Sequence, residues 1–252
     1  PGIISRICDQ PCQESCKRRE AGGALAINRL ELAALHYAAP TNRKIALPPP
    51  KNKRVAVVGG GLSGLTAAID LRQKGYGVAL FEAGGRLGGR VRTFGEQALP
   101  PAVIAADLEI IAAAGVEVFL HAPVGKAGGA LSLAGLCRDY DAVYLGPGPA
   151  PTGGWGLAAG ADGRIDIASG TFATSDAKVF AGGGQRQGGR YSPVTSIADG
   201  RSAAVSIDRF LQRASLTAGR AGKETFIHNR VKIGPGCINS GGVAGRSRSY
   251  NN

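Results

Sequence analysis

RVAVVGGGLSGLTAAIDLRQKGYGVALFEAGGRLGGRVR, residues 54–92, opens with an apolar run at 55–58 that leads directly into glycines spaced G-x-G-x-x-G. Apolar residues at helical spacing follow, so the pattern predicts a strand, a tight turn and a helix. The turn needs glycine because its backbone folds sharply and approaches a pyrophosphate, whose charge is stabilised by free N–H groups at the helix start. These glycines are Gly59, Gly61 and Gly64, with Leu62 and Ser63 between them.

A second apolar run, residues 78–81, ends in Glu82, eighteen residues after Gly64, and is followed by Ala83. A carboxylate at this point accepts hydrogen bonds from ribose hydroxyls. The triplet Gly88, Gly89 and Arg90 then lets backbone approach a second phosphate, a feature common in FAD proteins and unusual in NAD domains. The stretch therefore predicts an adenine dinucleotide site that holds FAD. The alternative is a structural glycine turn without a ligand.

Composition narrows the class of protein further. The 252 residues carry 30 Lys and Arg against 18 Asp and Glu, a formal net charge of +12, which favours acidic partners. The basic residues are scattered and lack interleaved aromatics, so nucleic acid is not expected. The sequence has no run of eighteen apolar residues and no signal peptide, and a cytoplasmic location is expected. Methionine is absent and the first residue is Pro1, which indicates a piece of a longer chain.

Three evenly spaced cysteines, Cys8, Cys12 and Cys16, lie near the start of the chain. In a cytoplasmic protein a close cysteine cluster is more often metal-binding than disulfide-bonded. Zinc sites commonly use paired CxxC motifs, so three single thiols with further ligands from elsewhere favour an iron–sulfur cluster. The alternative is three unligated thiols on a helix and a loop.

The next segments predict a helix and a linker. Residues 24–39 place Ile27, Leu30, Ala34 and Tyr37 on one face of an amphipathic helix, with Glu31 beside that face. The proline-rich residues 46–53 follow, and polyproline II geometry there is expected to separate two domains.

The order of these motifs resembles a known family. A CxxxCxxxC segment, an INRLE helix, a proline-rich linker and VAVVGGGLSGLTAA are followed by LPPAVIAADLEIIAAAGVEVFL, DAVYLGPG, VFAGGG and SIADGRSAAVSIDRFL. This order is similar to the small subunit of glutamate synthase, the N-terminal module of dihydropyrimidine dehydrogenase and the bifurcating transhydrogenases, over about residues 4–212.

The resemblance implies an α/β architecture, with a Rossmann-like three-layer FAD-binding domain after a small helical iron–sulfur segment. The expected divisions are a helical segment at 1–45, a linker at 46–53, the FAD domain at 54–212 and a basic, glycine-rich tail at 213–252. Relatives insert a complete NAD(P)-binding domain with its own glycine fingerprint into the FAD domain. This chain has only a short connection between about 149 and 170, so the nicotinamide domain is expected to be absent.

The resemblance also implies site residues. Cys8, Cys12 and Cys16, with Glu31 as the oxygen ligand, are expected to hold a 4Fe-4S cluster completed by residues outside the chain or upstream of Pro1. Gly184 stands where relatives have an aspartate that contacts the flavin, and Pro147 removes a backbone donor from the preceding turn. A helix starting near Pro193 is expected to point its N-terminus at the isoalloxazine. The flavin contacts so implied near the end of the domain are Gly148, Gly183, Gly184, Pro193, Val194 and Thr195.

The function that these features predict is an FAD- and iron–sulfur-containing electron-transfer subunit of a larger oxidoreductase. Its expected partners are other oxidoreductase subunits or acidic, ferredoxin-like carriers in a hetero-oligomer. One alternative is a scaffold that has lost catalysis. Another is an amine-oxidase-like flavoenzyme, because EAGGRLGGRVRT resembles the glycine-pair motif of that family. No catalytic triad can be assembled, so hydrolysis is not expected.

Overall fold

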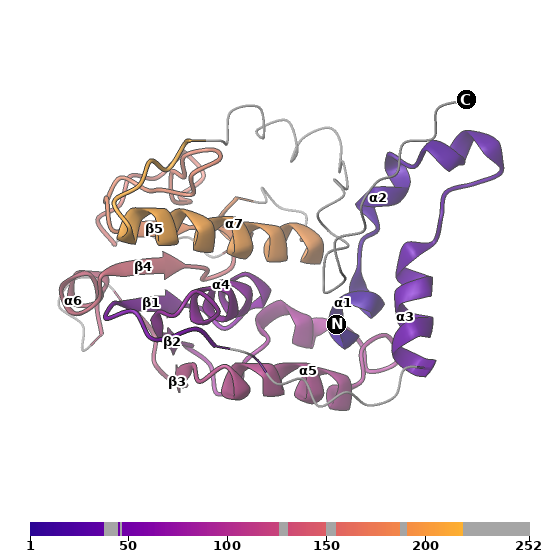
Figure 1. Cartoon of the computed structure of the whole chain (residues 1–252), viewed down its shortest axis with the longest axis horizontal. Helices are drawn as coiled ribbons and strands as arrows, with labels where there is room; N and C mark the ends of the chain where they lie inside the picture. The colour runs from indigo at the N-terminus through magenta and orange to yellow at the C-terminus, as the bar shows by residue number, and fades with distance from the viewer. Residues whose placement is uncertain (38–44, 46, 126–130, 150–154, 187–190, 219–252) are drawn as a thin grey trace, which may run out of the picture.

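The computed structural model describes residues 1–37, 45, 47–125, 131–149, 155–186 and 191–218. Its centre is a parallel sheet in the order β3-β2-β1-β4-β5 (Figure 1). The strands are β1 (Arg54–Val58), β2 (Gly77–Phe81), β3 (Glu117–Phe119), β4 (Ala142–Leu145) and β5 (Val179–Ala181). The order reverses at β1, whose neighbours β2 and β4 continue the sheet in opposite directions, and ligands of open α/β sheets bind at such a point.

Helices cover one face of this sheet. They are α4 (Leu62–Arg72), α5 (Pro101–Ala113) and α7 (Pro193–Leu211). Val55 and Val57 of β1 pack on this face against Ala67 and Ala68 of α4 and against Ile207 of α7. The alternate residues of β1, Ala56 and Val58, point to the other face.

The second face is covered by α6 (Leu133–Asp139) and by residues 155–167. Leu133 and Leu136 of α6 and Ile165 of that segment are buried against the strands. Both faces of the sheet are thus closed, which confirms the predicted α/β, Rossmann-like fold. The sequence analysis did not predict α6.

The apolar runs predicted as strands at 55–58 and 78–81 are β1 and β2, each of which begins one residue earlier. The stretch LPPAVIAADLEIIAAAGVEVFL at 99–120, which carried part of the resemblance, contains α5 and β3. Two 3₁₀ turns, η2 (Gly89–Thr93) and η3 (Gly183–Gln185), lie near the sheet's carboxyl edge. The tail predicted at 213–252 is described only as far as residue 218.

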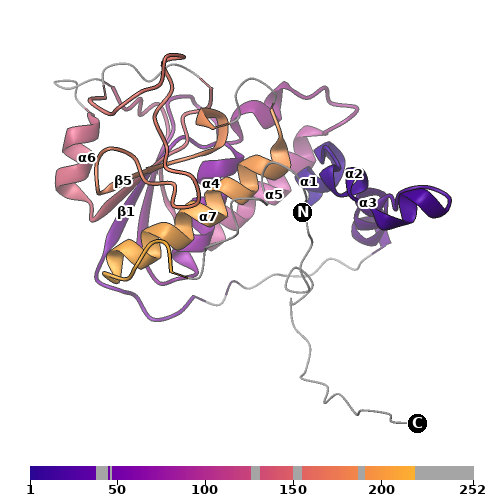
Figure 2. The same cartoon turned by 90° about the horizontal axis from the view of Figure 1, so that it is seen from above.

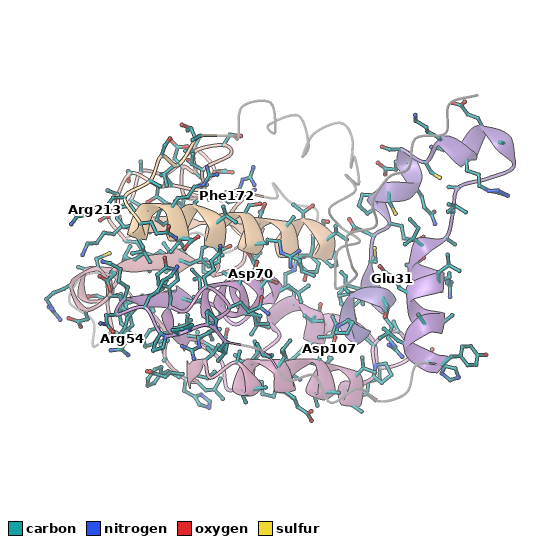
Figure 3. All side chains as sticks on the ribbon, viewed as in Figure 1. Glu31, Arg54, Asp70, Asp107, Phe172 and Arg213 are labelled. Atoms are coloured by element: carbon teal, nitrogen blue, oxygen red, sulfur yellow. The ribbon has the colours of Figure 1, made fainter. Side chains whose placement is uncertain are left out.

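The first part of the chain forms an arm, defined here as residues 1–37, at the end of the molecule opposite α6 (Figures 1 and 2). It attaches through Ile3 and Ile7, which pack on Val91, Leu99 and Ile104. Asp107 of α5 also accepts hydrogen bonds from the backbone N–H groups of Gly2 and Ile3 (Figure 3). The arm contains α1 (Gly2–Ile7), α2 (Pro11–Glu14), η1 (Lys17–Ala21) and α3 (Ile27–Tyr37).

The helix predicted at 24–39 is present as α3, but its apolar residues lie largely in solvent. Leu30 is 65% exposed and Tyr37 is 85% exposed. The periodicity predicted a helix with an apolar side, and the described residues do not cover that side. Much of the linker predicted at 46–53 is described, and Lys51 at its end donates a backbone hydrogen bond to Gly75.

Candidate functional site

A pocket of about 310 Å³ lies where the carboxyl ends of β1, β2 and β4 meet the starts of α4 and α7. It brings together nine of the residues that the sequence analysis assigned to a dinucleotide. They are Gly59, Gly61, Leu62, Ser63, Glu82, Gly89, Arg90, Gly148 and Gly184. Residues that were not predicted to bind the ligand also line it, namely Thr93, Gly146, Pro147, Pro149, Tyr191 and Ser196.

The three glycines of the first turn serve different purposes. Gly59 has a φ of +100°, and a Cβ there would lie 2.3 Å from the carbonyl oxygen of Gly146. A Cβ on Gly64 would lie 1.9 Å from the carbonyl oxygen of Gly59, so Gly64 permits close packing of α4 and does not line the pocket. A Cβ on Gly61 meets no atom within 4 Å. Gly61 therefore leaves open space in the pocket wall, at the N-terminus of a helix that attracts anions.

The Glu82 carboxylate links the glycine turn to the end of β2 through hydrogen bonds. Its Oε2 accepts a hydrogen bond of 2.6 Å from the backbone N–H of Gly60, and its Oε1 accepts one of 2.8 Å from Gly84. Each carboxylate oxygen keeps a second lone pair for a ligand hydroxyl. The neighbouring predicted residue Ala83 is exposed and does not line the pocket.

The glycine pair after β2 lies directly against the first turn. Gly88 donates a backbone hydrogen bond of 2.7 Å to the carbonyl oxygen of Gly60. A Cβ on Gly89 would lie 3.1 Å from the Cα of Gly61, so the two loops touch through their backbones. Gly89 lines the pocket, whereas Gly88 lies behind it.

Arg90 and Tyr191 form a cation–π pair in the pocket wall, with the Arg90 Cζ 4.5 Å from the centre of the tyrosine ring. The Tyr191 hydroxyl is hydrogen-bonded to Ser196, and burial raises the pKa of Tyr191. The sequence analysis did not predict this pair because Arg90 and Tyr191 lie far apart along the chain.

The N-terminus of α7 is capped beside the pocket. Ser192 accepts a hydrogen bond from the backbone N–H of Thr195, and Pro193 occupies the first helical turn, as predicted. Pro193, Val194 and Thr195 were predicted to contact the flavin, yet they do not line the pocket, which α7 reaches through Ser196.

A buried ion pair supports the turn after β5. Asp199 of α7 is fully buried, accepts a hydrogen bond from the backbone N–H of Gly183 and pairs with Arg186 at 2.7 Å. Burial raises the pKa of Asp199, and Arg186 opposes that shift. Gly183, a predicted flavin contact, thus lies behind the pocket. Because α7 supplies this carboxylate only in the folded chain, no local motif predicted it.

At the next position, Gly184, a Cβ would lie 2.5 Å from the carbonyl carbon of Gly148. The backbones of Gly184 and Gly148 thus lie too close together to admit an aspartate side chain at position 184 in this conformation. A second buried polar contact, between Ser63 and Tyr144, lies beneath the first turn, and burial raises the pKa of Tyr144.

The predicted cluster ligands lie in the arm and are only partly gathered. The charges of Cys12 and Glu31 act on Cys8, whose pKa is raised mainly by burial. Figure 3 shows Glu31 on the side of α3 that faces α1 and α2. A hydrogen bond from the backbone of Leu25 lowers the pKa of Cys16. Within the described ranges, no three cysteine, histidine or acidic side chains are grouped closely enough to hold a metal ion.

The fold and the pocket together define a dinucleotide-binding α/β domain. Residues 57–114 match the profile of a family described as an NAD(P)-binding Rossmann-like domain. The matched region starts within β1 and includes the Gly59–Gly64 turn, where the sequence analysis predicted FAD.

The relatives include a glutamate synthase and subunits of other oxidoreductases, which confirms the resemblance drawn from the sequence. The chain is 31% identical to the NADPH-Fe(3+) oxidoreductase subunit beta of Geobacter sulfurreducens, over 59% of this chain and 22% of the relative. It is 31% identical to the NADH-type glutamate synthase of Schizosaccharomyces pombe, over 59% of this chain and 7% of the relative. It is 32% identical to subunit PreT of the NAD-dependent dihydropyrimidine dehydrogenase of Salmonella typhimurium, over 57% of this chain and 35% of the relative.

The chain therefore spans about a third or less of the length of these curated relatives. Among solved structures, a thioredoxin reductase from Gloeobacter violaceus aligns with a TM-score of 0.43 at 14% identity, over 65% of this chain and 97% of that one. In the part of the chain that the structure describes, every helix is too short or too polar to span a lipid bilayer.

Proposed function

We propose that this chain is an FAD-binding, electron-transferring part of a larger oxidoreductase. The observation that carries the proposal is the open space at Gly61 and Gly148, where an added Cβ meets no atom within 4 Å. Both glycines line the pocket at the point where the strand order reverses. Backbone without side chains, next to the N-terminus of a helix, leaves room for a dinucleotide pyrophosphate and N–H groups to bind it.

Named residues would bind successive parts of FAD. Glu82 would accept hydrogen bonds from the adenosine ribose, and the N–H groups from Gly61 to Ser63 would bind the pyrophosphate. The contact between the backbones of Gly89 and Gly61 favours FAD over NAD(P), because it brings a second loop to the same phosphates. When bound, FAD supplies an acceptor that takes electrons in pairs and releases them singly.

We further propose that Cys8, Cys12, Cys16 and Glu31 contribute to a 4Fe-4S cluster whose other ligands come from outside the described residues. The electrostatic contact of Cys8 with Cys12 and Glu31 supports part of this set. The charge of Asp9, next to Cys8, also acts on Tyr191 in the pocket wall. We accordingly propose that residues 1–45 form the cluster-binding segment, 46–53 the linker, 54–212 the FAD-binding domain and 213–252 the tail. The names of two relatives as subunits support an assembly with partner subunits.

FAD binding is tested with a pair of glycine variants. Gly61→Leu fills the open space in the pocket and is expected to abolish FAD retention after gel filtration, measured by visible absorbance. Gly95 is exposed and also has no atom within 4 Å of an added Cβ, so Gly95→Leu is the matched control that retains FAD. Circular dichroism checks the fold, since leucine at a helix N-cap costs about 1 kcal/mol.

Two outcomes contradict the FAD proposal. The first is a wild-type chain that binds NADH or NADPH but not FAD. The second is a Gly61→Leu variant that holds FAD as tightly as Gly95→Leu does.

The cluster is tested by iron content after anaerobic preparation. Cys12→Ala removes a proposed ligand and is expected to lower bound iron and visible absorbance. Cys137→Ala, which changes a thiol packed beside the sheet, is expected to leave both unchanged. Equal iron in the two variants would show that the arm does not hold the cluster.

A further inference from the structure

Tyr191 is held in the pocket wall from two directions. Arg90 lies over its ring at 4.5 Å, and Ser196 is hydrogen-bonded to its hydroxyl. All three residues line the pocket, and Ser196 is buried in α7 with its hydroxyl donating to the carbonyl oxygen of Ser192. A ring restrained at its face and at its hydroxyl keeps one orientation, so it presents a preformed aromatic surface to a ligand.

The strand order indicates which half of a dinucleotide meets this surface. Glu82 ends β2 and Gly61 follows β1, so the ribose and the pyrophosphate take up that side of the sheet. The remaining half must lie beyond β1, over the ends of β4 and β5. Gly148 and Gly184 approach each other there, and α7 begins there directly after Tyr191 and Ser192.

We propose that Tyr191 lies in van der Waals contact with the isoalloxazine ring of bound FAD, and that Arg90 and Ser196 hold it in place. The inference rests on the proposed function. A second observation concerns the other neighbour of the ring, since Asp9 lies close enough to act on Tyr191 electrostatically. Tyr191 thus lines the pocket and also feels the charge of Asp9, the residue after Cys8.

Flavin fluorescence tests this contact directly. A phenol in van der Waals contact with an excited flavin donates one electron and recovers it, which quenches the emission, whereas a phenyl ring does not. The chain reconstituted with FAD is expected to show a short emission lifetime. Tyr191→Phe keeps the ring and the cation–π pair, so it is expected to retain FAD while its lifetime lengthens severalfold.

The chain offers a matched control in Tyr140, which lies under Arg54 at 5.0 Å, at the opposite edge of the sheet. Tyr140→Phe is expected to leave the lifetime at the wild-type value. Each variant differs from wild type by one hydroxyl group, so a lifetime change in Tyr191→Phe that is missing in Tyr140→Phe reports on Tyr191 alone. Equal lifetimes in wild type and Tyr191→Phe, with FAD bound to both, overturn this inference and leave the proposed function standing. Failure of the wild-type chain to bind FAD overturns both.

Discussion

The helices α3 and α7 both have apolar residues at helical spacing, but they lie in very different surroundings. Nine residues of α7 are buried, whereas none of α3 is. The reason is in the side chains. Small residues on α7 let it approach α4 so closely that a Cβ on Gly200 would lie 2.2 Å from the carbonyl oxygen of Ser63. On α3 the large apolar side chains of Leu30 and Tyr37 are exposed, and Ile27, Leu32 and Leu35 are only half-buried.

Helical periodicity by itself does not determine whether a helix is buried. It identifies a helix with an apolar side, but the burial of that side depends on a partner surface elsewhere in the chain. For α7 that surface is α4 and the sheet, and the resulting layer holds the pocket in shape. The described residues offer α3 no comparable surface.

Substitution of one residue on each helix tests this difference with the largest expected effect. Ile207→Ala on α7 removes a fully buried side chain and is expected to lower the free energy of unfolding by about 2–5 kcal/mol. Leu30→Ala on α3 is expected to change it by no more than about 0.5 kcal/mol. Urea unfolding followed by Trp155, the single tryptophan, measures both because Trp155 packs on the sheet. A similar loss in the two variants would mean that α3 is packed as tightly as α7.

The sequence predicted β1, β2, α4, the start of α7 and many of the pocket residues because local rules determine them. Strand, glycine turn, helix and acid follow one another within 54–92, so their contacts are set by chain connectivity. In the structure the Gly60 N–H of the turn donates a hydrogen bond to Glu82, as this order predicts.

The parts that the sequence did not predict depend on residues far apart along the chain. Arg90 and Tyr191 meet only after α7 packs across α4, and Asp199 reaches Gly183 from a later helix. Neither pair forms a motif. The segment containing α6 lacks a glycine turn of the kind that marked β1 and α4, and its burial depends on the completed sheet.

At the C-terminal end of α7, the carboxylate of Asp208 joins this helix to residues near β1 and β2. Asp208 accepts hydrogen bonds from Tyr76 at 2.7 Å and Gln212 at 2.6 Å, and it pairs with Lys51 and Lys74 at 3.3 and 3.0 Å. Burial by itself raises the pKa of Asp208, but the hydrogen bonds from Tyr76, Lys74 and Gln212 outweigh it and lower the pKa to about 2.

Because the folded pKa lies below the ordinary value of 3.8, the stabilisation is complete above that value and is lost as the pH falls toward 2. The shift corresponds to about 2 kcal/mol at neutral pH. Asp208→Asn is therefore expected to be less stable than wild type by about that amount at pH 7, and the difference should shrink as the pH falls from 4 to 2. Urea unfolding followed by Trp155 at each pH measures the difference. A stability difference that stays constant down to pH 2 would mean that Asp208 acts through packing alone, and that its charge does not stabilise the contact of α7 with Lys51, Lys74 and Tyr76.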